Sequence, residues 1–281
     1  MRLPLLLLAA IAAASFAGPP LAAALGIDPQ AVDLLDRFAG PSPAHPLGTD
    51  ELGRDVLFRL LEGGRVSLSI GIAAAVAAAA LGTAIGLAAG YLGGWTDRVL
   101  MRATDALIAL PLLPLLIVLA ALDLDKLGLP PKLVRSDDIS LFRILALAVL
   151  VGWTTAARLV RGATLVTRER DFVRAARSLG ARVPHILRLH ILPNVLGPLI
   201  VATSLSVGDI VLLESVLSFL GLGIQPPLAS WGSMLSNAQE LIASEPMLAV
   251  YPGLMIFVTV IACNLFGDAL QRRWDPRELR S

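Results

Sequence analysis

Long, nearly uncharged apolar stretches alternate with short polar segments along this chain. A helix needs about 20 apolar residues to cross the roughly 30 Å of hydrocarbon in a bilayer. Hydrophobic residues make up 56% of the sequence, whereas soluble domains are about 45–50% apolar. The pattern predicts an all-α integral membrane protein with six transmembrane helices, at about 3–24, 66–92, 99–122, 141–163, 194–222 and 247–270.

The first apolar stretch is open to two interpretations. Arg2, the apolar run and the small residues near Ala22–Ala24 also fit a cleavable signal peptide. The run from Leu3 to Leu25 is longer than the roughly 7–15 apolar residues of a typical signal peptide. We therefore favour a retained transmembrane helix.

The distribution of charge along the chain predicts its orientation. Net charge is only +1, so no overall positive field favours nucleic acid as a partner. With six spans and an internal N-terminus, most Lys and Arg residues fall inside, and most Asp and Glu residues outside. Cytoplasmic loops of membrane proteins carry such a basic excess. We expect a multi-pass protein with both termini in the cytoplasm.

One polar segment, about 164–193, is densely basic and lies between two apolar spans. Its arginines are Arg168, Arg170, Arg174, Arg177, Arg182 and Arg188. Phe172, Ala176 and Leu179 recur at i, i+4, i+7, which predicts one apolar face on a short helix. Gly180 is suited to end that helix.

A second short helix is expected to follow in the same segment. Pro184 suits its first turn, Ile186, Leu187 and Ile191 would form its apolar face, and Pro193 is expected to end it. The pair would form a helix–turn–helix elbow on the cytoplasmic side. Such a segment can lie on anionic lipid or dock in a groove of a partner protein.

Three glycines and two prolines stand out within the spans. Gly82, Gly86 and Gly90 repeat at four-residue spacing, which lets helix backbones approach closely in lipid. They would pack within this chain or against a second, similar subunit. Pro111 and Pro114 are expected to kink the third span.

The fifth span contains two carboxylates, Asp209 and Glu214. A charged side chain at the centre of a membrane helix costs about 2.5–3.5 kcal/mol on insertion scales. The two side chains should point about 140° apart around the helix axis, so one pore cannot easily hold both. We predict a translocation interface from Glu214, Asp209 and Ser218; for Glu214 the alternative is a hydrogen bond to a neighbouring helix.

The sequence lacks recognisable enzyme motifs. There is no GxxxxGK[ST], GxSxG or HExxH pattern. Cys263 is the only cysteine, and the three histidines are scattered. We expect no catalytic, cofactor or metal site. The alternatives are a membrane enzyme built on Asp209 and Glu214, whose divergence argues against it, and a passive channel or scaffold.

The basic segment carries a family resemblance. F-V-R-A-A-R-S-L-G-A, followed by H-I-L-P-N, resembles the "EAA" loop of ABC-importer permeases. That resemblance implies a coupling helix that docks in a cleft of an ATPase subunit. Arg174 replaces the glutamate that is usual at the first motif position. The residues to which we assign this role are Asp171, Phe172, Arg174, Ala175, Ala176, Arg177, Leu179, Gly180, Ile186, Leu187, Leu192 and Pro193.

Two further stretches, His45–Gly71 and Leu212–Leu235, resemble dipeptide/oligopeptide/nickel-type permeases, close to the "C"-type subunit. The resemblance implies the architecture of a type I ABC-importer permease in a bacterial inner membrane. Its implied partners are a homologous second permease, two ATPase subunits that hold ATP and Mg²⁺, and an extracytoplasmic solute-binding protein. The solute would be a peptide, a nickel complex or a similar small molecule.

These expectations divide the chain into three regions. Residues 1–65 would form the first span and an extracytoplasmic segment, 66–270 the permease domain, and 271–281 a cytoplasmic tail. The extracytoplasmic segment would be a solvated cap with local ion pairs or a contact for the solute-binding protein. Trp231 would belong to an aromatic belt at the membrane surface.

Overall fold

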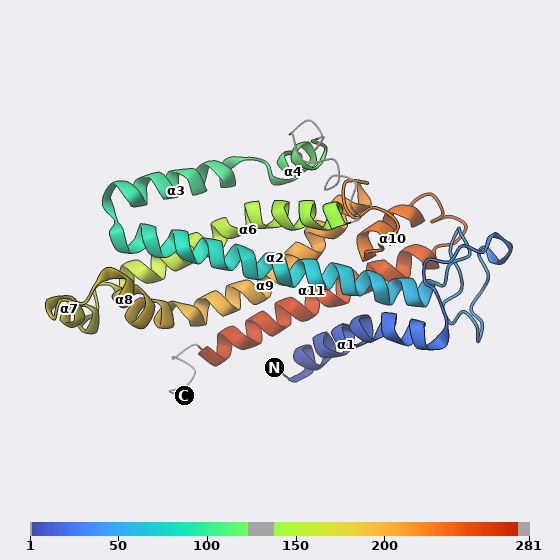
Figure 1. The fold of residues 1–281 in the computed structure, drawn as a ribbon, viewed down its shortest axis with the longest axis horizontal. Helices are drawn as coiled ribbons and strands as arrows, with labels where there is room; N and C mark the ends of the chain where they lie inside the picture. The colour runs from blue at the N-terminus through green and yellow to red at the C-terminus, as the bar shows by residue number, and fades with distance from the viewer. Residues whose placement is uncertain (1, 123–137, 275–281) are drawn as a thin grey trace.

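The computed structural model of the 281-residue protein describes residues 2–122 and 138–274 (Figure 1). Those residues form helices joined by turns. The long helices are α1 (Arg2–Leu25), α2 (Val56–Leu92), α3 (Gly94–Ala109), α6 (Asp138–Thr167), α9 (Leu192–Phe219) and α11 (Met247–Trp274). The shorter ones are η1 (Leu34–Asp36), α4 (Leu112–Ala120), α7 (Asp171–Ser178), α8 (Val183–Ile186), the π-helix η3 (Leu187–Ile191) and α10 (Trp231–Ala238).

Among the described residues, five segments can cross a membrane, or six, as the hydropathy pattern predicts, if one broken pair of helices counts as a single span. Five helical segments are long and apolar enough on their own, and α3 with α4 forms a sixth candidate bent by 88°. We expected a single kinked helix at 99–122. Instead, α3 ends at Ala109 and Pro111 is the N-cap of α4, because proline has no N–H to continue the ladder.

The start of α1 and the end of α11 point toward the same end of the helix bundle (Figure 1). In Figure 1, α1 points its first residues toward the end of the bundle at which α11 finishes, and α7 and α8 lie at that end too. The segment between α1 and α2, which we call the cap segment (residues 26–55), lies at the opposite end with α10.

Helix α2 begins at Val56, well before the expected start of the span near 66. Asp55 fixes this start, because its side chain accepts a hydrogen bond of 2.9 Å from the Phe58 N–H. The charged first turns are buried in the cap segment, where Arg59 Nε lies 3.4 Å from Asp50 Oδ2. Hydropathy alone misses this extension because tertiary contacts hold two of its charged side chains: Arg59 pairs with Asp50, and Gln30 Nε2 donates to Glu62 Oε1 at 3.3 Å.

The three spaced glycines of α2 pack against α6 within this chain. A Cβ atom on Gly86 would lie 2.6 Å from the Ala157 carbonyl oxygen, and one on Gly90 would lie 2.7 Å from Thr164 Cβ. A Cβ atom on Gly82 would lie 2.5 Å from the α6 backbone. The missing side chains therefore allow the backbones of α2 and α6 to approach closely.

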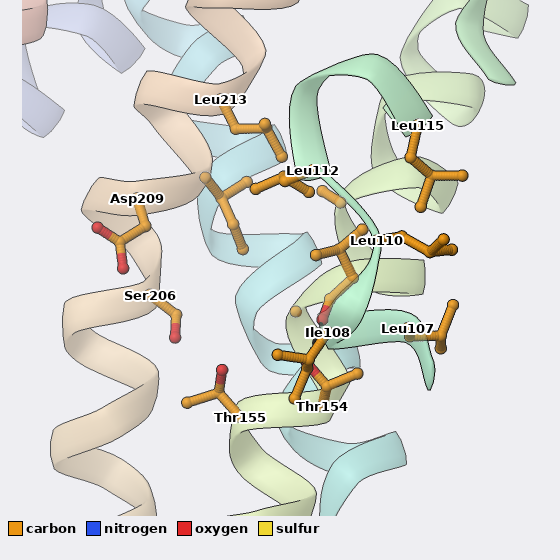
Figure 2. Close-up of a pocket in the computed structure, with 14 residues that line it drawn as sticks. Leu107, Ile108, Leu110, Leu112, Leu115, Thr154, Thr155, Ser206, Asp209 and Leu213 are labelled. Carbon is orange, nitrogen blue, oxygen red and sulfur yellow. Dashed lines mark hydrogen bonds between the residues drawn. The ribbon is translucent and has the colours of Figure 1, made fainter. Parts of the chain in front are cut away.

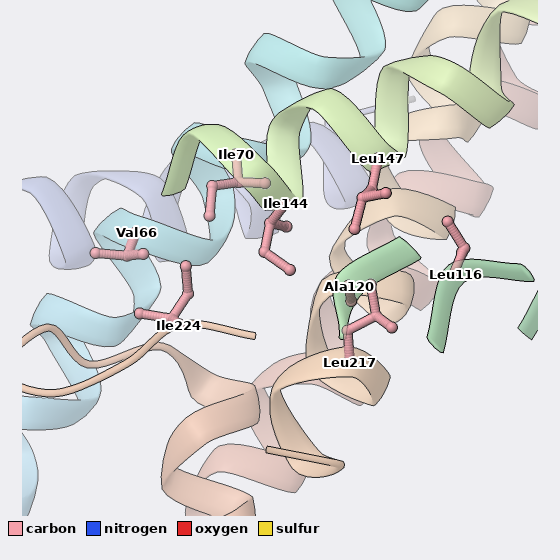
Figure 3. Packing of buried hydrophobic residues seen from close by; sticks show 8 residues of the cluster. All are labelled: Val66, Ile70, Leu116, Ala120, Ile144, Leu147, Leu217 and Ile224. Atoms are coloured by element: carbon pink, nitrogen blue, oxygen red, sulfur yellow. The ribbon is translucent and has the colours of Figure 1, made fainter. Parts of the chain in front are cut away.

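Two kinds of contact hold α3 and α4, the two parts of the broken crossing, against the other helices. At the α3 end, Arg161 Nη2 of α6 donates to Asp97 Oδ2 at 2.7 Å, and Arg158 Nη2 lies 2.5 Å from Asp105 Oδ1. Helix α4 instead packs into an apolar cluster between α2, α6 and α9 (Figure 3). The buried members of that cluster are Val66, Ile70, Leu116, Ala120, Ile144, Leu147, Leu217 and Ile224.

Candidate functional site

The basic segment folds as the expected elbow, and a glycine turn ends its first helix. The Ala181 N–H donates to the Ala176 carbonyl, and the Gly180 N–H donates to the Arg177 carbonyl, both at 3.0 Å. Gly180 has φ +80°. These paired bonds form a Schellman motif, whose left-handed position favours glycine. The turn fixes the direction in which the chain leaves α7.

A substitution tests this turn. We expect Gly180→Val to loosen α7, because a left-handed backbone costs a residue with a Cβ atom about 1–2 kcal/mol. Hydrogen–deuterium exchange should show faster exchange of the α7 amides. Gly180→Asn is the control, since asparagine tolerates this conformation, and equal protection in both variants would contradict the assignment.

The apolar face of α7 differs from the predicted one. Val173 is fully buried and packs in a cluster with Ile186 and Ile191, which Ala176 borders. Phe172 and Leu179 are 45% and 89% exposed and do not join it. Helix α7 therefore rests on the bundle through Val173 and Ala176, while Phe172 and Leu179, the two larger members of the i, i+4, i+7 pattern, are directed outward.

The second half of the elbow merges with the fifth span. Pro184 lies in the first turn of α8, as expected. Pro193 does not end the helix; it lies in the first turn of α9, directly after the π-helical turn. Within that turn the Leu192 N–H donates to the Leu187 carbonyl. The wider π-helical turn accommodates a proline, which has no N–H to donate, so the elbow continues into α9 as one helical segment, Val183–Phe219.

Arginines link the elbow to its surroundings. Arg174 Nη2 donates to Glu169 Oε2 at 3.2 Å, and this hydrogen bond lowers the pKa of the Glu169 carboxyl. Arg168 Nη1 donates to the Gly90 carbonyl at 2.7 Å, at the end of α2. The Arg177 guanidinium lies 5.6 Å from the centre of the Tyr91 ring. Arg174 thus pairs with a carboxylate of its own chain.

Glu214 is fully buried and makes the hydrogen bond to a neighbouring helix that the alternative interpretation describes. It accepts bonds from Ser67 Oγ of α2 at 3.0 Å and from Ser218 Oγ at 2.7 Å. The Trp231 N–H donates to Ser67 Oγ at 3.3 Å, and the Ile224 N–H donates to Ser218 Oγ at 3.1 Å. Glu214 and Ser218 are both buried within this chain, where they tie α9 to α2 and α10.

Trp231 is also internal rather than part of an aromatic belt. Its side chain is fully buried, and its indole N–H donates to the Leu60 carbonyl at 3.0 Å. Ser230 caps α10 and positions the tryptophan at the first turn. Gly64 makes room for the ring, because a Cβ atom there would lie 2.8 Å from the indole. A sequence pattern cannot show such a pairing between distant segments.

Of the three residues predicted to form the translocation interface, Glu214, Asp209 and Ser218, only Asp209 lines the cavity described next. The cavity has a volume of about 410 Å³ and lies between α9, α6 and the break from α3 to α4 (Figure 2). Figure 2 shows Asp209, Ser206 and Thr155 on one side and the leucines of α3 and α4 on the other. The predicted divergence of Asp209 from Glu214 agrees with one exposed and one buried side chain.

Comparison with known proteins decides the family. Residues 82–280 match the family described as binding-protein-dependent transport system inner membrane components. The chain belongs to this family. It is therefore a transmembrane permease subunit of an ABC importer and not an enzyme. Within residues 2–122 and 138–274, no group of three or more His, Cys, Asp or Glu could hold a metal ion.

Named relatives of this permease cover most of its length. It is 38% identical over 250 residues to a probable D,D-dipeptide transport system permease protein from Escherichia coli K12, which covers 89% of this chain and 79% of the relative. It is 41% identical over 226 residues to a glutathione transport system permease protein from Pectobacterium atrosepticum, which covers 80% of this chain and 70% of that protein.

A solved structure shares the fold of the permease. The crystal structure of an amino acid ABC transporter with histidines superposes with a TM-score of 0.56 and 16% sequence identity, over 76% of this chain and 94% of that one. At this identity the likeness supports the fold alone. The helical architecture expected from the sequence is that of an ABC transporter permease.

Proposed function

We propose that this permease imports short peptides or peptide-like solutes. The observation that carries the proposal is the alignment with relatives named for dipeptide, glutathione and peptide transport, each over at least 80% of this chain. The permease would form the path with a homologous second permease. A solute-binding protein would deliver the peptide on the outer side, and both termini of this chain would lie in the cytoplasm.

The elbow is proposed to receive force from two partner ATPase subunits, which hold ATP and Mg²⁺. Phe172 and Leu179 project outward from α7, among Arg170, Arg174 and Arg177. Exposed apolar side chains on a short helix suit insertion into a groove of another protein. An anionic lipid surface accepts the same combination of arginines and apolar side chains, so co-purification of the ATPase subunits is the measurement that separates the two.

The packing beneath α7 supports transmission of that force. Val173 joins α7 to a buried cluster that also contains Val160 of α6 and Val195 of α9. A displacement of α7 would therefore move two membrane-crossing helices as one body. ATP binding in the partners can drive transport only by favouring one conformation of the attached permeases.

Charge-introducing substitutions at the outward residues test the coupling. We expect Phe172→Glu with Leu179→Glu to lower ATP-dependent uptake of trialanine at least about tenfold, because a desolvated carboxylate opposes docking in an apolar groove. The ATPase subunits should no longer co-purify with the permease. The complex is assayed in proteoliposomes together with its binding protein.

A matched control keeps both positions apolar. Phe172→Leu with Leu179→Met should retain uptake and co-purification. Arg170→Glu with Arg182→Glu adds a test of lipid contact, because it weakens adhesion to anionic membrane whether or not α7 docks. Normal uptake and co-purification in the double glutamate variant would refute the docking of α7.

A further inference from the structure

The cavity beside Asp209 is a membrane-depth site with its own chemistry. It is formed by the break between α3 and α4, by α6 and by α9. Its volume of about 410 Å³ falls within the roughly 300–1,000 Å³ that is usual for small-molecule sites. Ser206 and Asp209 are about one turn apart on α9, Leu213 follows about one turn later, and all three line the cavity.

Asp209 has no partner of its own in the described part of the chain. Among residues 2–122 and 138–274, Asp209 takes part in no hydrogen bond and no ion pair. Glu214, on the same helix, is satisfied by two serine hydroxyls. A carboxylate at this depth is stable only beside a partner or in a polar cavity. Asp209 therefore calls for a positively charged or donor-rich group from outside these helices.

The neighbouring hydroxyl groups present acceptors to the cavity. Ser206 Oγ donates its proton to the Ala202 carbonyl at 2.9 Å, and Thr154 Oγ1 donates to the Val151 carbonyl at 2.8 Å. Their oxygen lone pairs are what remain for a ligand. Together with the Asp209 carboxylate they make a surface that accepts hydrogen bonds. An ammonium group, with three donors and a positive charge, matches such a surface.

We propose that this cavity binds the α-ammonium group of the transported peptide, with Asp209 as its counter-ion. The inference rests on the proposed function, because a short peptide carries such a group at neutral pH. Leu110, Leu112 and Leu213 line the cavity and would contact the apolar part of the peptide. A transition-metal ion fits less well, since it favours several imidazole, thiolate or carboxylate ligands and none of the described groups provides them.

Binding is measured directly on the four-subunit complex in lipid nanodiscs without its binding protein. The probes are trialanine and N-acetyl-trialanine, compared by saturation-transfer NMR titration. The wild type should bind trialanine about tenfold more tightly than the acetylated peptide, because acetylation removes the charge. Asp209→Asn should abolish that preference and leave binding of N-acetyl-trialanine unchanged. Asp209→Glu should restore it in part.

A second carboxylate on a span provides the control. Asp268 of α11 is exposed and does not line this cavity, so Asp268→Asn should behave as the wild type. The comparison of the two peptides on the wild type needs no variant, and equal affinity there would overturn the inference. An equal loss for both peptides in Asp209→Asn would also overturn it and would indicate a structural ion pair with the second permease.

A separate measurement tests the proposed peptide import independently of the site at Asp209. ATP-dependent uptake of trialanine by wild-type proteoliposomes, with the binding protein present, reports whether peptides are imported at all. Absence of uptake would refute peptide import and with it the ammonium site. Normal uptake together with no preference for the free ammonium would refute only the site at Asp209.

Discussion

Gly86→Leu is expected to prevent the permease from assembling. The new side chain would begin 2.6 Å from the Ala157 carbonyl oxygen and 2.7 Å from Val160 Cβ. Overpacking a core costs about 1–3 kcal/mol when neighbours can shift. Here the nearest obstacle is the backbone of α6, so we expect an effect at or above the upper end. The helices α2 and α6 would separate, and the elbow would lose its support.

The yield of monodisperse permease after detergent extraction measures this effect, together with its thermal unfolding. Gly162→Ala is the matched control, because Gly162 is also in a helix and an added Cβ atom there would meet nothing within 4 Å. Alanine favours helix over glycine, so the control should be as stable as the wild type or slightly more so. A stable, assembled Gly86→Leu permease would disprove close packing of α2 on α6.

The second large effect is expected from Glu214→Ala. The change removes the acceptor of two buried hydroxyl donors, Ser67 Oγ and Ser218 Oγ, and each unsatisfied buried donor costs about 1–3 kcal/mol. It also leaves a void where a fully buried side chain was. The first turn of α10 should loosen, because the Trp231 N–H bonds to the same Ser67 hydroxyl.

Glu214→Gln separates hydrogen bonding from charge. Its amide oxygen can replace one of the two carboxylate acceptors, and the side chain has nearly the same shape. We expect the Gln variant to transport and to lie between the wild type and the Ala variant in stability, while the Ala variant melts several degrees lower than the wild type and shows faster amide exchange in α10. Equal stability of the Ala and Gln variants would refute the structural role of this carboxylate. A stable Gln variant without transport would instead restore an electrostatic role.

The sequence predicted those structural features that depend on a single residue or on a short run of neighbouring residues. The spans follow from runs of apolar residues, and the end of α7 follows from Gly180, whose left-handed turn is a property of one position. The close approach at Gly82, Gly86 and Gly90 follows from four-residue spacing. The sequence alone left open which partner these glycines meet, and the structure gives α6.

Features that depend on distant segments were not predictable in this way. Val173, which is flanked by Phe172 and Arg174, is the anchor of the elbow because residues of α8 and α9 pack in the same buried cluster. Trp231 is buried because Gly64 leaves space for the ring, and nothing near position 231 indicates that. The acceptor-lined cavity likewise gathers Thr154, Ser206 and Asp209 from two helices.

The corner between α3 and α4 has a consequence for solvent. The last carbonyls of a helix lack partners within it, and Pro111 offers no N–H to them. Irregular backbone at membrane depth persists only where protein buries it or water reaches it. Leu110 and Leu112, on either side of the corner, line the cavity beside Asp209. We therefore expect water to reach this corner within the bilayer. The hydrophobic barrier across this permease would then be locally thinner even before a solute binds.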